Sequence, residues 1–248
     1  MFKHRNKKLF IFALQIYQTN NTHTMNKSRN ILVAMGITVS ALTFASCSDA
    51  PKGDAATVAG VQTATAAEGT TIAIDSTAST VRFVGNGVGK NHPGVFKVKE
   101  GAVTVANNTV TGGQFTIDIN SMQLEEKGEM FETKLRPHLL NADFFDAEKY
   151  PAAKFEITKL EPYTATGADT SVVVGANYLV SGNLTLKDAT KNITFPAKVV
   201  VTGNEVTAAA NFDIDRTWWN MSYGNDKSLG DKFISPTVNV QLNLQAKQ

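Results

Sequence analysis

Alternation of apolar and polar residues dominates the chain from about residue 70 to residue 248. The clearest case lies near the C-terminus, where Val238, Val240, Leu242 and Leu244 are separated by single polar residues. A period of two places successive side chains on opposite faces of a strand, so this segment predicts a strand with one buried face. The same pattern recurs over residues 115–119, 178–186, 193–199 and 206–214.

Turn-forming residues separate these predicted strands. They are Asn107-Asn108, Gly112-Gly113, Gly167, Gly203-Asn204 and Gly224-Asn225. Gaps of hairpin length predict antiparallel pairing of neighbouring strands. Only residues 122–146 show roughly helical spacing, which predicts one or two short helices ending around Pro137 and Asn141. About eight strands with a single helical excursion predict an all-β fold, and a closed barrel is favoured over a sandwich because closure removes exposed strand edges.

The interior of such a barrel is a candidate ligand site. An eight-stranded barrel is about wide enough to hold one small or elongated ligand, or to be filled by its own side chains. Both arrangements need an apolar inner face, so periodicity leaves the two open. The candidate inward residues are Phe115, Ile117, Phe155, Ile157, Val180, Leu184, Phe212, Ile214, Val240 and Leu242.

The first 46 residues predict a targeting segment rather than part of the fold. All six Lys and Arg residues before Cys47 occur without any acidic residue, and from Met25 a basic start is followed by an apolar run over residues 31–43. This pattern is typical of a secretory signal, and the run is too short to span a bilayer as a stable helix. Residues 44–47 resemble a bacterial lipobox, in which Cys47 becomes lipidated. We expect translation to start at Met25.

Residues 47–69 predict a flexible tether between this lipid anchor and a domain over residues 70–248. From Ser48 to Gly69 the chain has seven Ala, three Thr and no aromatic residue, a composition that buries little apolar surface.

The whole chain has 24 Lys and Arg against 22 Asp and Glu. Without the six cations before Cys47, the mature chain has 18 against 22, a net charge of −4, which gives no indication of nucleic-acid binding.

No motif of the chain indicates catalysis or a cofactor. The glycine-rich stretch 85–91 lacks the spacing of a phosphate-binding loop and predicts a bent or bulged strand at a barrel corner. With Cys47 assigned to lipidation, His92 and His138 are too few for a zinc site and lie 46 residues apart. Asp213 and Asp215 flank an inward Ile214 and are expected to face solvent.

Residues 215–220, Asp-Arg-Thr-Trp-Trp-Asn, place an arginine beside two tryptophans after a strand. Such a group can stack and form hydrogen bonds at a pocket rim, or it can close one end of the barrel. We favour closure of the barrel end.

Four ordered motifs over about residues 72–246 resemble the YceI-like family of lipid- and polyisoprenoid-binding, lipocalin-like proteins. Residues 138–146 resemble the family's HL-x-S-x-DFFD stretch, with Asn141 in place of Ser, and Tyr150-Pro151 with Phe155 continues it. Residues 182–191 resemble its G-x-LT-x-x-G-x-TK strand and turn, with Asp188 in place of Gly. Residues 215–232 resemble the ending of a branch that also has a loop like that at His92.

The resemblance implies an extended, lipocalin-like antiparallel barrel whose apolar cavity binds an isoprenoid or another lipid, in a protein exported to the cell envelope. It supplies no catalytic residues. A polar head of the ligand would need donors at the cavity mouth, for which the candidates are Lys90, His92, His138 and Arg216.

The leading function is therefore that of a membrane-anchored lipoprotein on the periplasmic or surface face, which sequesters or carries a hydrophobic ligand and is not an enzyme. Two alternatives stay open: an envelope enzyme acting on a lipid or glycan with a histidine base, and a structural barrel that binds partners. The sequence leaves a homodimer open.

Overall fold

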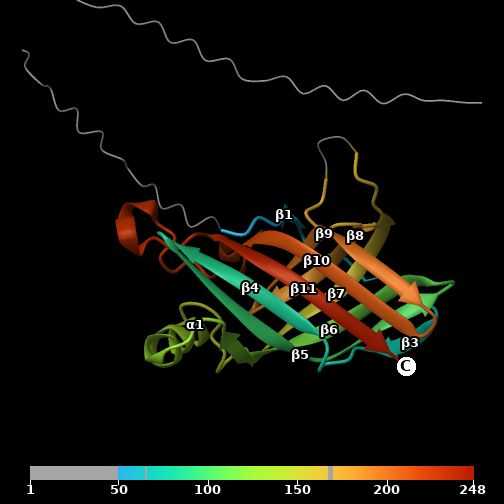
Figure 1. Cartoon of the computed structure of the whole chain (residues 1–248), viewed down its shortest axis with the longest axis horizontal. Helices are drawn as coiled ribbons and strands as arrows, with labels where there is room; N and C mark the ends of the chain where they lie inside the picture. The colour runs from blue at the N-terminus through green and yellow to red at the C-terminus, as the bar shows by residue number, and fades with distance from the viewer. Residues whose placement is uncertain (1–49, 65, 167–169) are drawn as a thin grey trace, which may run out of the picture. The chain divides into compact units, whose positions relative to one another are not determined.

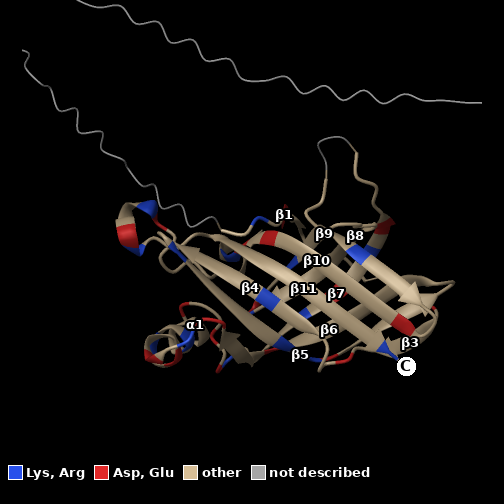
Figure 2. Ribbon diagram, viewed as in Figure 1, with Lys and Arg blue, Asp and Glu red and all other residues tan. Residues whose placement is uncertain are grey.

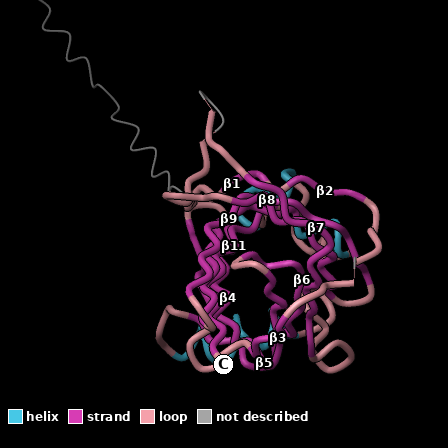
Figure 3. The backbone as a smooth tube through the Cα atoms, turned by 90° about the vertical axis from the view of Figure 1, so that its right-hand side faces the viewer, coloured by secondary structure: helices cyan, strands magenta, loops and turns pink. Residues whose placement is uncertain are grey.

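The computed structural model describes residues 50–64, 66–166 and 170–248 of the chain. Its core is a closed barrel of eight antiparallel strands, in which each strand pairs with the next along the chain and β10 pairs with both β9 and β11. Seen along the barrel, the strands form a ring (Figure 3). The prediction of an all-β antiparallel barrel with a short helical excursion is confirmed. The signal segment, Met25 and Cys47 lie outside the described residues.

Eight strands form the barrel, and five of them contain the segments of predicted alternation. Figure 1 shows the arrangement of the eight strands. They are β4 (Thr80–Gly87), β5 (Lys90–Ala106), β6 (Thr109–Leu124), β7 (Ala152–Pro162), β8 (Tyr178–Leu186), β9 (Ala189–Thr202), β10 (Glu205–Asp215) and β11 (Thr237–Lys247). A further short strand, β3 (Thr70–Ala73), pairs with the C-terminal part of β5. Inward residues of these strands form one continuous apolar core.

The turns agree in part with the predicted ones. Asn107 and Asn108 both have positive φ angles, 52° and 57°, as a tight hairpin between β5 and β6 requires. The prediction of a turn at Gly112-Gly113 is wrong, because both residues lie inside β6 beside a register shift between Thr104 and Val105. There the glycines accommodate irregular pairing instead of reversing the chain. Gly167 lies outside the described residues.

The glycine-rich stretch 85–91 forms a hairpin instead of the predicted bend within a strand. Gly87 at the end of β4 pairs with Lys90 at the start of β5, and Gly89 between them has a φ of 67°. A residue in this left-handed region is most easily glycine, which explains the motif without a phosphate site. The hairpin lies at the end of the barrel where the cavity opens.

The helical excursion between β6 and β7 consists of the π-helical turn η1 (Phe131–Leu135) followed by α1 (Arg136–Leu140). Asn141 caps its C-terminus in an extended conformation, as predicted. Pro137 does not end the helix, because it occupies the first turn of α1, where its missing N–H costs nothing. Leu135, Leu139 and Leu140 pack against the core of the barrel.

The chain after Pro51 differs from the expected tether, because it is paired with the barrel. β1 (Asp54–Ala55) lies parallel to β10, and β2 (Thr57–Ala59) lies antiparallel to β9. β9 and β10 pair directly with each other only over residues 197–202 and 205–210, next to the hairpin that joins them. Residues 54–59 therefore fill the seam where β9 and β10 diverge, and we call them the seam segment. Open backbone donors and acceptors of the two strands explain the pairing.

The outer surface carries charges of both signs. Lys and Arg are interspersed with Asp and Glu over the strands and loops seen in Figure 2. Three of the ion pairs join exposed side chains at neighbouring positions: Lys154 with Glu156, Lys159 with Glu161, and Lys247 with Glu205. These pairs contribute little to stability because they are exposed. Within the described ranges, no helix is long and apolar enough to cross a membrane.

Candidate functional site

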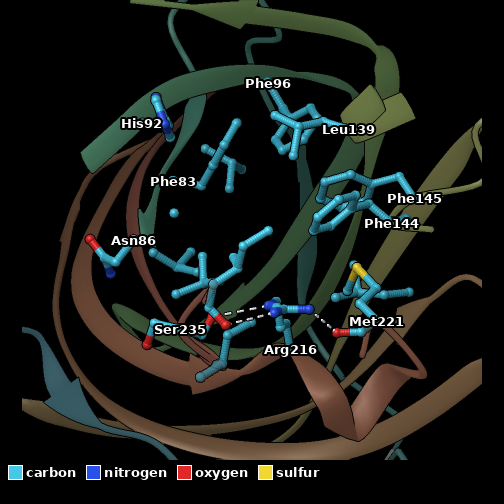
Figure 4. A pocket seen from close by; sticks show the side chains of 18 of the residues that line it. Phe83, Asn86, His92, Phe96, Leu139, Phe144, Phe145, Arg216, Met221 and Ser235 are labelled. Carbon is cyan, nitrogen blue, oxygen red and sulfur yellow. Dashed lines mark hydrogen bonds between the residues drawn. The ribbon is translucent and has the colours of Figure 1, made fainter. Parts of the chain in front are cut away.

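The barrel contains a cavity of about 370 Å³ at the end bounded by the β4–β5 hairpin, the helical excursion and the loop between β10 and β11. Its walls are formed by inward aliphatic and aromatic side chains, with a few polar groups at one side (Figure 4). An apolar cavity of this kind holds ordered water poorly, because water needs two to four polar partners. The cavity is therefore suited to an apolar ligand.

The structure brings most of the predicted inward residues together around this cavity. Those that line it are Phe115, Ile117, Phe155, Leu184, Phe212, Ile214, Val240 and Leu242. The other two, Ile157 and Val180, lie deeper in the barrel at a separate void of about 50 Å³. Their contact with a ligand stays a prediction.

The four predicted polar residues also line the cavity, although they come from separate parts of the chain. Lys90 and His92 lie on β5, His138 lies on α1, and Arg216 follows β10. Lys232 and Asp231 join them from the 3₁₀ helix η3 (Lys227–Lys232). The mouth thus carries polar groups above an apolar interior, and the role of these groups toward a ligand stays a prediction.

Each of the two histidines is bonded to a carboxylate. His92 Nδ1 lies 2.8 Å from Glu126 Oε2, and His138 Nε2 lies 3.0 Å from Asp143 Oδ2. The His138 ring also makes edge contacts with Phe144 and Tyr223, at centroid distances of 5.2 and 4.8 Å. Tyr223 belongs to residues 220–236 between η2 (Arg216–Trp219) and β11, which we call the mouth loop. The position of His138 is fixed by packing between the helical excursion and the mouth loop, so His138 joins two elements that border the cavity.

Arg216 is 4 % exposed and holds the mouth loop through its guanidinium. Nη2 donates to the carbonyls of Tyr223 and Ile234 at 2.8 and 3.0 Å. Nε donates to the carbonyl of Ser235, and Nη1 donates to that of Met221 (Figure 4). Burial lowers the pKa of Arg216 from its usual value, and the nearby carboxylate of Asp215 opposes that shift.

Trp219 and Arg216 of the Asp-Arg-Thr-Trp-Trp-Asn motif lie in different surroundings. Trp219 is fully buried in the 3₁₀ helix η2 (Arg216–Trp219), and its Nε1 donates to the carbonyl of Leu184 at 3.0 Å. It anchors η2 to β8 and is absent from the cavity wall, whereas Arg216 contributes to that wall. Arg216 thus forms hydrogen bonds at the cavity wall, whereas closure of the barrel end by this motif stays a prediction.

Several cavity residues were not predicted. They are Val81, Phe83, Phe96, Leu139, Phe144, Phe145, Ala153, Phe195 and Phe233 among others. Phe195 lies in a segment whose alternation was recognised, so its inward direction could have been read from the sequence. Phe144 and Phe145 come from a connection, where no periodicity tells which way a side chain points.

The part of the chain that the structure describes contains no cluster of three or more His, Cys, Asp or Glu side chains arranged to hold a metal ion. Asp213 and Asp215, the carboxylate pair considered from the sequence, have structural partners. Asp213 accepts hydrogen bonds from Gly53 and Asn239, and Asp215 accepts from Thr217 at the start of η2.

Comparison with protein families assigns residues 73–246 to the YceI-like domain, which covers the whole barrel. The chain belongs to the YceI-like family. A curated relative, a UPF0312 protein of Serratia proteamaculans, is 30% identical over 112 residues, which are 45% of this chain and 50% of the relative. This YceI-like chain thus spans about half the length of the curated relatives it matches.

Two solved structures show the same fold as this YceI-like protein. BcnA of Burkholderia cenocepacia has a TM-score of 0.56 at 24% identity, over 70% of this chain and 99% of BcnA. A polyisoprenoid binding domain from Saccharophagus degradans, implicated in plant cell wall breakdown, has a TM-score of 0.51 at 17% identity, over 71% of this chain and 97% of the domain. Both similarities extend over almost the entire length of the other protein.

Proposed function

We propose that this YceI-like protein binds a hydrophobic ligand, an isoprenoid or another lipid, inside the barrel and shields it from water. The observation that carries the proposal is the apolar cavity of about 370 Å³ that opens at a polar mouth. Burying apolar ligand surface there contributes about 25 cal/mol per Å² before the costs of ordering. The similarity to a polyisoprenoid binding domain supports the same class of ligand.

The polar mouth supports a ligand with a polar or anionic head. Lys90 and His92 border the cavity from β5, and Lys232 borders it from η3. Arg216 adds a buried cation to the wall, although its guanidinium donates hydrogen bonds to four backbone carbonyls. We expect the head to contact Lys90, His92 and Lys232, while Arg216 contributes its charge and holds the loop in place.

We further propose that the N-terminal segment directs this carrier to the cell envelope. The signal pattern and Cys47 support export followed by lipidation, which would anchor the barrel to a membrane. A single acyl chain gives only reversible membrane binding, so stable anchoring needs the several chains of a fully processed lipoprotein.

The ligand is tested by native mass spectrometry of protein purified without harsh detergent, followed by organic extraction. We expect a bound lipid that is recovered chemically unchanged. A barrel that is reproducibly empty and takes up neither prenyl alcohols nor fatty acids would contradict the binding function. Recovery of a chemically altered lipid after incubation would instead support the enzyme hypothesis with His92 or His138 as base.

The anchor is tested separately by replacing Cys47 with serine. We expect the unmodified protein in the membrane fraction and the Cys47→Ser variant in the soluble fraction, with the same ligand retention. Membrane association of the variant equal to that of the unmodified chain would contradict lipid anchoring at this residue. An N-terminal peptide from residues 1–24 on the cellular protein would contradict a start at Met25.

A further inference from the structure

The barrel interior is divided into two unequal spaces by a row of aromatic rings. The large cavity of about 370 Å³ lies at the mouth, and the void of about 50 Å³ lies toward the opposite end. Phe115, Phe155 and Phe195 line both spaces, as does Leu242 on the facing strand β11. These side chains therefore separate the two spaces. We call the four phenylalanines Phe115, Phe155, Phe195 and Phe212 the aromatic partition.

The partition crosses the barrel as a continuous chain of ring contacts. Phe115 on β6 lies 5.5 Å from Phe155 on β7, between ring centroids, and Phe155 lies 5.9 Å from Phe195 on β9. Phe195 stacks on Phe212 of β10 at 3.9 Å with an angle of 12° between the ring planes. All four side chains are buried, with exposed fractions of 7 % or less. The rings are thus shielded from solvent and contact one another in a row, while empty space lies on either side of the row.

The strands continue past the partition with small side chains. On β10, Phe212 and Ile214 face the large cavity, whereas Ala208 and Ala210 face the small void. The rings of the partition therefore close off the small void from the large cavity. Like the cavity, the small void is lined mainly by apolar side chains. Removing one ring would join the two spaces into a longer channel.

We propose that the aromatic partition limits the length of the apolar chain that the barrel accepts, at about fifteen carbon atoms, or three isoprene units. This inference rests on the proposed function. A dry apolar cavity of about 150 Å³ holds one benzene, so by the same ratio a cavity of this size holds roughly fifteen carbon atoms. A longer chain leaves its remaining carbons at the mouth in water, where they gain nothing from burial.

The test measures dissociation constants for prenyl alcohols of two, three and four isoprene units by displacement of a fluorescent fatty-acid probe. We use the unmodified chain, Phe195→Ala, Phe195→Leu and the control Val206→Ala. Phe195 is chosen because it lines both spaces and touches two other rings of the partition. Val206 lines the small void but not the large cavity, so its truncation removes core volume without opening the partition. The leucine variant keeps the test valid if the alanine variant fails to fold.

For the unmodified chain and for Val206→Ala, we expect affinity to rise at least about tenfold from two units to three and less than about threefold from three to four. For Phe195→Ala and Phe195→Leu, the step from three to four units becomes at least about tenfold. An equally large second step in the unmodified chain overturns the inference, as does an unchanged step in both Phe195 variants. Binding of no prenyl alcohol by any of the proteins contradicts the proposed function itself, and the inference with it.

Discussion

The ring of Phe155 occupies the space where residue 182 would carry a side chain. A Cβ atom built on Gly182 would lie 2.2 Å from Cζ of Phe155 and 2.7 Å from its Cε2. The two residues lie on paired strands, with Phe155 opposite Leu184 and Gly182 opposite Ile157, so the ring crosses diagonally over the glycine. The glycine of the family motif on β8 thus positions one ring of the aromatic partition.

Replacement of Gly182 by alanine is therefore expected to displace the Phe155 ring and to lower the free energy of unfolding by about 1–3 kcal/mol, as overpacking of a core does. Urea denaturation measures the change. Gly60→Ala is the matched control, because a Cβ at Gly60 meets no atom within 4 Å and a change within about 0.5 kcal/mol is expected. Equal stabilities of the two variants would contradict this role of Gly182.

A charge introduced at a buried position of the seam segment is expected to lower the free energy of unfolding. Ala56 lies between β1 and β2, is 9% exposed, and donates its N–H to the carbonyl of Asp213 on β10 at 3.1 Å. Ala56→Lys would place an unpaired cation in the seam, and we expect a loss of at least about 2 kcal/mol in unfolding free energy. Ala55→Lys is the control, because the side chain of Ala55 is exposed.

Hydrogen exchange of the β9 and β10 amides distinguishes a local opening of the seam from a general loss of stability. We expect Ala56→Lys to increase exchange at residues 192–194 and 212–213, which pair with the seam segment, before it affects β6 and β7. Identical stability and exchange of Ala55→Lys and Ala56→Lys would mean that residues 54–59 are a tether after all.

Lysine is not expected to replace Arg216 without a loss of stability, although both side chains are cations. Its planar guanidinium donates to four carbonyls of residues 221–235, and the single ammonium of a lysine has three donors that cannot match this arrangement. We expect Arg216→Lys to lower the unfolding free energy by about 2–4 kcal/mol and to make the mouth loop sensitive to proteases.

The control for this substitution is Arg136→Lys. Arg136 also donates to backbone carbonyls, those of Met122 and Asn120, but from a half-buried position outside the cavity wall. A smaller loss of stability and no cleavage in residues 221–235 are expected. If both variants behave alike, burial of Arg216 has no special importance for the mouth.

The fold could be predicted because every strand of a ligand-sized barrel keeps one face in water, which imposes a period of two on the sequence. The same period shows that Phe195 and Phe212 point inward. It does not show that their rings stack at 3.9 Å, because the two residues are not paired and their approach depends on how far β9 and β10 diverge. The aromatic partition is a consequence of barrel geometry that no local pattern encodes.

Composition was a poor guide to residues 50–69 for a related reason. The abundance of alanine and threonine predicts little burial, and most of this stretch is indeed exposed. Residues 54–59 within it are held by backbone pairing to β9 and β10, which any residue except proline can provide and which leaves no trace in side-chain composition. The cavity mouth is similar, since Phe144 and Phe145 reach it from a loop.

The ion pair between Arg82 and Glu125 predicts a measurable dependence on pH. Arg82 Nη2 donates to Glu125 Oε2 at 2.9 Å, and Arg82 Nε donates to the other carboxylate oxygen, which joins β4 to the residue after β6. The hydrogen bond from Arg82 lowers the pKa of Glu125 below its usual 4.5. A carboxyl whose pKa is lower in the folded state stabilises the fold above its unfolded pKa and loses that effect as pH falls through the folded pKa.

Because both side chains are partly exposed, we expect Glu125→Gln to lower the unfolding free energy by only about 0.2–1 kcal/mol at neutral pH. The difference from the unmodified chain should shrink below about pH 4.5 and vanish below the folded pKa, since the carboxylate is then protonated in both states. Urea denaturation across this range measures it, with Glu129→Gln as an exposed control that shows no such change. A difference that persists unchanged in acid would show that the amide disturbs packing and that the ion pair contributes nothing.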